Sequence, residues 1–286
     1  MADDQNTVLL GKSSAGITTI CINRSSRRNA VDGPTAQKLH AAFLSFDNDP
    51  TQKICVFHSS GGVFCAGADL QEVAKISSPE NQQSQRKVDV EQSKSSKLLP
   101  VDGTNPAPMG PSRMTLSKPV IAAVSGFAVA GGLELSLLAD MRIVEEDAVF
   151  GVFCRRFGVP LIDGGTVRLQ RIVGLGRAMD MILTGRAVTA QEALGMGLAN
   201  RVVAKGQAFQ EAMALARTLL KFPQRCMNVD RKSVYYAAYE ARGFEDAMRF
   251  EFENGKAVVM EESVKGAARF RDGVGRHGKF DLGSKL

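Results

Sequence analysis

Short runs of β-branched and other apolar residues recur along the first half of the chain. They occupy residues 16–23, 53–60, 118–126 and 141–147, and their length and composition are typical of buried strands. Between the first two runs, residues 35–48 carry apolar side chains at helical spacing, directly after the helix-start sequence Asp-Gly-Pro. Strand, helix and strand in repetition predict an α/β domain with parallel strand pairing.

The strand pattern stops near residue 206, and only helical patterns follow it. Residues 206–222 and 244–260 each place apolar side chains along one helix face, the second through Phe244, Met248 and Phe252. Such faces predict helices that pack on the α/β part or on another subunit. A capping box, Thr-Ala-Gln-Glu at 189–192, predicts one further helix start.

Residues 77–117 interrupt this order, because they are polar at first and then rich in proline and glycine. A segment of that length inside a compact domain is typical of a lid or a binding loop. We therefore expect an α/β core over residues 1–205, with 77–117 as a long loop or lid insertion, and a helical C-terminal region over 206–286.

Composition argues against several classes of function. The 286 residues are 44% hydrophobic, and no apolar run is long enough to span a membrane. Five scattered cysteines without a C-x-x-C pair, together with three separated histidines, predict reduced thiols and no metal site. The formal net charge of +6 is dispersed and aromatic residues make up only 6%, which argues against nucleic-acid binding and favours a small polyanionic ligand.

Two glycine-bearing turns follow predicted strands, at residues 61–70 and 125–140. In the second turn Gly131-Gly132 begins an amphipathic helical run, with Glu134 in its first turn, so backbone N–H groups are exposed there. Two such turns could offer two N–H donors to one oxygen, the geometry of an oxyanion hole. Alternatively, the glycines serve only the backbone conformation of tight turns.

Four segments together resemble the enoyl-CoA hydratase/isomerase (crotonase) superfamily: residues 64–70, 118–151, 164–174 and 183–203. Their order and spacing fit that family from about residue 8 to the C-terminal tail. The resemblance implies an α/β fold built as a spiral of ββα units, followed by helices that assemble homotrimers, often paired as hexamers. It also implies an acyl-CoA substrate, with coenzyme A as part of the substrate and no separate cofactor.

The resemblance implies how the substrate is held. The thioester oxygen would lie between two backbone N–H donors, those of Ala68 and Gly131, which stabilise an enolate. The residues implied along the coenzyme A path are Cys65, Ala66 and Asp69, and its phosphates would meet Arg27 or Arg28. These arginines could equally belong to a solvated turn.

The proton carriers depart from the family pattern, which uses two glutamates on opposite sides of a water molecule. The first aligns with Glu134, but the second position holds Cys154, whose thiol is a poor substitute for a carboxylate and is expected to be a small buried residue. Asp163 is the alternative proton carrier, although it could instead cap the following helix. Arg155 or Arg156 could pair with either carboxylate and lower its pKa.

These features predict an enzyme that hydrates trans-2-enoyl-CoA in fatty-acid β-oxidation. Double-bond isomerisation, other enolate chemistry, or acyl-CoA binding without catalysis are the alternatives. The final tripeptide Ser284-Lys285-Leu286 is a peroxisomal address, which predicts recognition by a peroxisomal import receptor and a peroxisomal location if the source is eukaryotic.

Overall fold

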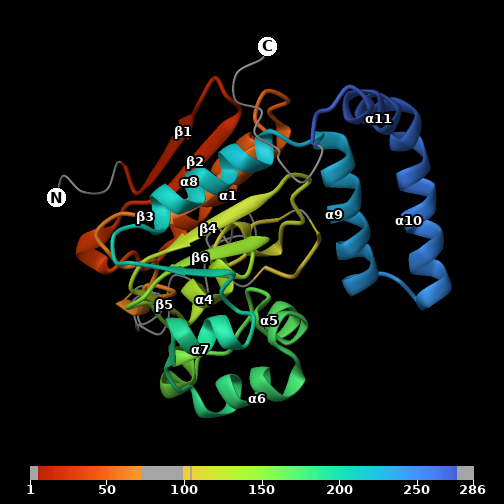
Figure 1. The fold of residues 1–286 in the computed structure, drawn as a ribbon. Coiled ribbons are helices and arrows are strands. Elements are labelled where there is room, and N and C mark those ends of the chain that lie inside the picture. The colour runs from red at the N-terminus through yellow and green to blue at the C-terminus, as the bar shows by residue number, and fades with distance from the viewer. Residues whose placement is uncertain (1–5, 72–98, 104, 276–286) are drawn as a thin grey trace, which may run out of the picture. The chain divides into compact units, whose positions relative to one another are not determined.

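The structure is a computed structural model that describes residues 6–71, 99–103 and 105–275 (Figure 1). The chain divides into two compact units, Met1–Ala216 and Arg217–Leu286. The division falls inside helix α8 (Ala208–Leu220), whereas the sequence places a boundary before that helix. The final tripeptide Ser284-Lys285-Leu286 lies outside the described residues.

The first unit is built on a six-stranded sheet with the order β1-β2-β3-β4-β6-β9. Strands β1 and β2 pair antiparallel, and every other neighbouring pair in this sheet is parallel. The predicted parallel pairing is therefore confirmed, and the four predicted strands are present as β2, β3, β4 and β6. The strands of the sheet span Val8–Lys12 (β1), Ile17–Ile22 (β2), Ile54–Ser59 (β3), Val120–Val124 (β4), Met141–Glu145 (β6) and Arg201–Val203 (β9).

A second, three-stranded sheet has the order β5-β7-β8, and helices connect the strands of both sheets (Figure 1). Its strands are Phe127–Val129 (β5), Val149–Gly151 (β7) and Val188–Thr189 (β8). The helices of the first unit that precede α8 are Gly33–Asn48 (α1), Gly131–Ser136 (α4), Gly165–Val173 (α5), Leu175–Thr184 (α6) and Ala190–Gly195 (α7). Short 3-10 turns span Ser25–Arg27 (η1), Pro111–Arg113 (η3) and Phe153–Phe157 (η4).

Helix starts follow the capping chemistry that the sequence indicates. The Asp32 side chain accepts a hydrogen bond from the Thr35 N–H at 2.9 Å and caps α1. The Thr189 side chain accepts from the Glu192 N–H at 3.3 Å, which confirms the predicted capping box at the start of α7. Each cap satisfies a backbone donor that has no partner inside its helix.

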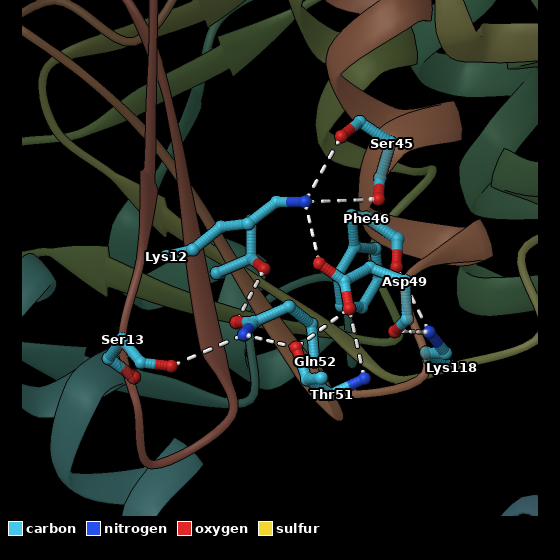
Figure 2. A network of polar contacts seen from close by, with 9 residues as sticks. Lys12, Ser13, Ser45, Phe46, Asp49, Thr51, Gln52 and Lys118 are labelled. Carbon is cyan, nitrogen blue, oxygen red and sulfur yellow. Dashed lines mark hydrogen bonds and ion pairs between the residues drawn. The ribbon is translucent and has the colours of Figure 1, made fainter.

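Helix α1 is also fastened at its C-terminal end, by the polar network in Figure 2. Lys12 of β1 donates through Nζ to Asp49 Oδ2 at 2.7 Å and to Ser45 Oγ at 3.2 Å. Lys118, just before β4, donates to the carbonyl oxygens of Phe46 (3.0 Å) and Asp49 (2.7 Å). These contacts satisfy carbonyl groups near the end of α1 and hold the helix against the six-stranded sheet.

The described end of the predicted loop at 77–117 is packed rather than open. Met109, Ser112 and Leu116 are buried, and the 3-10 turn η3 is the helical element within 99–103 and 105–117. The prediction of a lid can therefore apply only to the part of this segment that precedes the packed residues; residues 77–98 lie outside the description.

The second unit is helical, as the sequence predicts. It contains α9 (Gln224–Tyr239), α10 (Phe244–Val258), a π-helical turn (Val259–Ser263) and α11 (Val264–Arg271). Tyr236 of α9 stacks on Phe250 of α10 with ring centroids 3.8 Å apart, which packs these two helices together. The apolar stripe of α10 is exposed in the single chain: Phe244 is 82% exposed and Phe252 is 65% exposed.

Candidate active site

Glu134 is placed by an unusual backbone step between β5 and α4. Ala130 adopts φ 53° and ψ −126°, a conformation that costs free energy for a residue with a side chain. It turns the chain so that α4 begins at Gly131 and carries Glu134 in its first turn, where the carboxyl group is 3% exposed. A Cβ at Gly132 would lie 2.1 Å from the Cys65 carbonyl oxygen, so the close approach of the two turns requires glycine there.

Two backbone N–H groups meet where these turns adjoin. Val31 donates to the Gly67 carbonyl at 2.8 Å and accepts from the Asp69 N–H at 2.9 Å. This parallel bridge leaves the N–H of Ala68, between them, directed away from Val31. A Cβ at Gly67 would lie 3.2 Å from the Gly131 nitrogen, so the turn that carries Ala68 lies against the start of α4.

Neither of these two N–H groups, on Ala68 and on Gly131, has a hydrogen-bond acceptor among the residues that the structure describes. Two adjacent donors without acceptors are what an oxyanion hole requires. The arrangement therefore supports the oxyanion-hole interpretation of these glycine turns over a purely conformational one.

A second carboxyl group, that of Asp163, lies beside Glu134. Glu134 Oε1 accepts from the backbone N–H groups of Asp163 at 2.9 Å and of Gly165 at 2.8 Å. Asp163 is 3% exposed, and its Oδ1 accepts from the Met109 N–H at 2.9 Å and from the Ser112 hydroxyl. The fold thus brings together two buried carboxyl groups whose residues lie 29 positions apart in the chain.

The alternative role for Asp163, as a helix cap, is wrong. The N-cap of α5 is Gly164, which has a φ of 89° and no side-chain cap. The left-handed glycine turns the chain into the helix, and the Asp163 side chain points instead to Met109 and Ser112. Ser112 is the site residue that sequence reasoning missed, because it lies within the segment predicted to be a lid.

Burial raises the pKa values of both carboxyl groups, and the proximity of Asp163 raises that of Glu134 further. Burial raises the pKa of Glu134 to about 7, and the negative charge of Asp163 adds to the increase. The pKa of Asp163 is also raised, chiefly by burial, against the opposing hydrogen bond from Ser112. A pair of this kind holds one proton near neutral pH and so offers a base and an acid together.

The comparisons with known proteins agree with this geometry. A sequence profile described as enoyl-CoA hydratase/isomerase matches residues 12–100 and 112–274. The chain belongs to this family. It is 35% identical over 204 residues to the enoyl-CoA hydratase EchA19 of Mycobacterium tuberculosis, covering 69% of this chain and 68% of that protein. It is 30% identical over 220 residues to the probable peroxisomal enoyl-CoA hydratase 1 of Arabidopsis thaliana, covering 77% and 75%.

A solved structure places the fold in the same family. The crystal structure of enoyl-CoA hydratase from Mycobacterium tuberculosis H37Rv superposes with a TM-score of 0.78 at 27% identity and covers 94% of this chain and 96% of that one. The predicted crotonase-like α/β fold and the predicted enzyme class are therefore confirmed.

Cys154 is the residue that the resemblance to the family aligns with the second glutamate. It lies in η4, is 8% exposed and belongs to the hydrophobic core. Burial raises the pKa of its thiol, and the charge of Glu134 raises it further, so the thiol stays protonated at neutral pH. This supports its interpretation as a packing residue.

The predicted pairing of Arg155 or Arg156 with a catalytic carboxylate is wrong. Arg155 donates through Nε to the Ile182 carbonyl at 3.1 Å, and Arg156 donates to the Gly185 carbonyl at 3.2 Å. Both arginines therefore bond to backbone at the end of α6. The positive charges that oppose the rise in these pKa values are instead those of Arg168 on α5, for both carboxyl groups, and of Arg113, for Asp163.

The residues that the resemblance implies for coenzyme A binding differ in their exposure to solvent. Arg27 and Arg28 are exposed, and Arg27 donates to the Gln71 side chain at 2.8 Å. Ala66 is half-buried. Asp69 is buried and lies 3.4 Å from the Arg24 guanidinium, an ion pair that fixes the turn beside Ala68.

Cys65 is fully buried in the core, and burial raises the pKa of its thiol to about 12. Its contribution is therefore to shape the turn rather than to touch a ligand. Within the described ranges no cluster of three or more histidine, cysteine or acidic side chains could hold a metal ion. The same ranges contain no helix with the length and apolar character of a membrane span.

Proposed function

We propose that this protein adds water to the double bond of trans-2-enoyl-CoA thioesters, as a step of fatty-acid β-oxidation. The observation that supports this most is the coupled pair of buried carboxyl groups, Glu134 and Asp163, beside two backbone N–H donors that have no acceptor in the described chain. Family membership supports the acyl-CoA substrate, because relatives named enoyl-CoA hydratase share 30 to 35% of the aligned residues.

The proposed reaction begins when the thioester oxygen accepts hydrogen bonds from the N–H groups of Ala68 and Gly131. Ionised Glu134 takes a proton from water while the water oxygen bonds to C3 of the acyl chain. The electron pair of the double bond moves to C2 and the thioester oxygen, which gives an enolate that the two donors stabilise. Asp163, which holds the proton of the pair when Glu134 is ionised, gives it to C2 and completes the 3-hydroxyacyl thioester. The proton that Glu134 took from water then passes to Asp163 and restores the pair.

Both pKa values are raised, which supports a pair that exchanges a proton near neutral pH. A base with a pKa near 7 is suited to accept a proton there. Glu134 is assigned as the base because it lies one helical turn from the Gly131 donor. The roles belong to a coupled pair, so a pH profile of the pair tests them together.

Double-bond isomerisation is the second candidate, and the observation that favours it is Cys154. An isomerase moves one proton between C2 and C4 and can use a single base, so the loss of the second family glutamate would not disable it. Other enolate chemistry follows the same logic.

The test is the loss of conjugated enoyl thioester absorbance with short, medium and long trans-2-enoyl-CoA substrates. We expect turnover by the native protein, loss of it in Glu134→Gln and Asp163→Asn, and retention in Cys154→Ala. Migration of the double bond without addition of water would identify an isomerase. Acyl-CoA binding with no turnover across hydratase and isomerase substrates would identify a non-catalytic binding protein.

We also propose that the protein assembles into trimers or hexamers through its C-terminal helices. The second unit exposes large apolar side chains along α10 and beyond it, including Phe244, Phe252 and Met260 (76% exposed). Faces of this kind are typical of subunit interfaces. Light scattering after size-exclusion chromatography should give three or six chains, and a monomer at micromolar concentration would contradict the proposal.

A peroxisomal location is proposed from the C-terminal Ser-Lys-Leu sequence. The named relatives do not agree on the compartment, since one Arabidopsis thaliana relative is called peroxisomal and a human relative is called mitochondrial. Deletion of the last three residues should abolish import into peroxisomes and leave enzyme turnover unchanged.

A further inference from the structure

A cavity lies at the carboxyl ends of the parallel strands in the six-stranded sheet. Its volume is about 250 Å³, and its lining includes His58 of β3, Ser125 after β4, Glu145 of β6, Lys205 after β9, and Ala208 and Phe209 of α8. All of these residues belong to the first unit.

The cavity is on the face of the sheet opposite the candidate active site. Successive residues of a strand point to opposite faces. In β4, Ala122 and Val124 belong to the core cluster that contains Leu133 of α4, whereas Ala123 and Ser125 line the cavity. The sheet therefore separates this cavity from Glu134 and Asp163, and no part of the proposed hydration uses it.

The side chain of Glu145 indicates that the cavity binds a ligand. Glu145 is the last residue of β6 and only 6% exposed, yet its carboxylate has no hydrogen bond or ion pair among the described residues. The Lys205 ammonium lies close enough for the charge of Glu145 to raise its pKa, but its ion pair, at 2.7 Å, is with Asp147 Oδ2. The carboxylate lines the cavity without a hydrogen-bonded partner in the described chain, so a positively charged or strongly donating group is the complementary occupant.

His58 adds a second acceptor to the same cavity. Burial lowers the pKa of its imidazole, which is therefore neutral at pH 7. A hydrogen bond with the Ser59 backbone opposes this shift, as a ring N–H donating to a carbonyl does, and the other ring nitrogen then carries a lone pair. The ring lies 4.4 Å from that of Phe209, which supplies an aromatic face beside the two acceptors.

From these observations we propose that the cavity binds a small organic cation, a primary ammonium group on a short apolar stem. The ammonium donates to the Glu145 carboxylate and to the His58 nitrogen, and the stem lies along Phe209 and the methyl groups of Ala123 and Ala208. A metal ion suits the cavity less well, because its lining offers only one carboxylate and one imidazole.

The probe is n-butylammonium chloride, compared with the neutral n-butanol at matched ionic strength. Binding is measured by saturation-transfer NMR and by thermal shift. We expect millimolar affinity for the ammonium and no measurable affinity for the alcohol. Glu145→Gln, which removes the charge but keeps the shape, should weaken binding about tenfold or more. Glu146→Gln is the matched control, because Glu146 is the exposed neighbour of the same charge, and it should change affinity less than about twofold.

A second variant, Ser125→Val, adds side-chain volume at the cavity wall and should abolish ammonium binding while enoyl-CoA turnover stays as in the native protein. Equal binding of the alcohol, unchanged affinity in Glu145→Gln, or no ammonium binding at millimolar concentration would overturn the proposal. Each outcome is independent of the hydratase assay, since the cavity is separated from the proposed catalytic pair.

Discussion

The raised pKa of Glu134 predicts that this protein is less stable at alkaline pH because of its own candidate catalytic base. Burial and the charge of Asp163 raise this pKa from an ordinary value of 4.5 to about 7 in the folded chain. The folded state therefore favours the protonated carboxyl group. Its contribution to stability is fully present below the unfolded pKa and is lost as pH rises through about 7. At pH 8 the penalty corresponds to about 3 kcal/mol of unfolding free energy.

Glu134→Gln removes this penalty without removing the local hydrogen bonds. A glutamine oxygen can still accept from the N–H groups of Asp163 and Gly165, and the amide cannot ionise. We expect the variant to be more stable than the native protein at pH 8, with a melting temperature higher by roughly 5 °C. At pH 4.5 the two should be nearly equal, because native Glu134 is then protonated. The same variant should lose enoyl-CoA turnover.

The assay is thermal unfolding followed by circular dichroism between pH 4.5 and 8.5 for both proteins. Glu146→Gln serves as the control, because it removes an exposed carboxylate and should show no pH-dependent difference of this size. A difference between Glu134→Gln and the native protein that does not grow with pH would refute the reasoning. So would a variant that is less stable at pH 8, because it would mean that the ionised carboxylate is stabilised where it lies.

Three further substitutions test individual contacts of the candidate active site. Ala68→Pro removes one donor of the proposed oxyanion hole and should lower turnover about 10²–10³-fold, whereas Ala68→Gly keeps the N–H and should retain most of it. Ser112→Ala removes the hydroxyl that donates to the second carboxyl group, so the pKa assigned to that group in the pH profile of kcat/KM should rise. Gly165→Ala places a Cβ 2.9 Å from Glu134 Cγ and Oε1 and should lower turnover about tenfold or more, whereas Gly176→Ala, with open space around it, should not.

Local sequence patterns predicted the strands and helix caps that depend on residues close together in the chain. The strands β2, β3, β4 and β6 are short apolar runs in which β-branched residues are frequent, and the caps at Asp32 and Thr189 are side-chain contacts within three residues. The strands β5, β7 and β8 contain two or three residues each, too few to show a period, and nothing in the sequence marked them.

The sequence predicted a site residue only where its position depends on neighbouring residues in the chain. Glu134 follows from its place in the first turn of α4, but the partners of Asp163 do not, because Met109 and Ser112 lie more than fifty residues earlier in the chain. The sequence before α5 is equally compatible with a capping aspartate, and the positive φ of Gly164 decides against it. Adjacency in the sequence was also misleading for Arg155 and Arg156, since η4 directs both side chains to the carbonyl groups at the end of α6.

The apolar stripe of α10 shows a different limit. The helical spacing predicts a face that packs on the α/β part or on another subunit, and Phe244 and Phe252 are exposed in the single chain. An amphipathic pattern indicates that a face is covered in the functional assembly, without indicating whether the same chain covers it. If another chain covers the exposed stripe of α10, the protein must form oligomers. Measuring the number of chains in solution therefore tests both the covered face and the proposed assembly.

The cysteine at the second glutamate position is best understood together with Asp163. The negative charge of Glu134 already raises the pKa of the Cys154 thiol, so the thiol lies within electrostatic reach of the pair. A glutamate at position 154 would add a third carboxyl group to a space where burial already raises the pKa values of two. Like charges in low-dielectric surroundings cannot all ionise, and one of the three would remain protonated at neutral pH without a role. A neutral thiol at 154 and a carboxyl group at 163 keep the count at two, which supports the proposal that Asp163, rather than residue 154, is the second proton carrier.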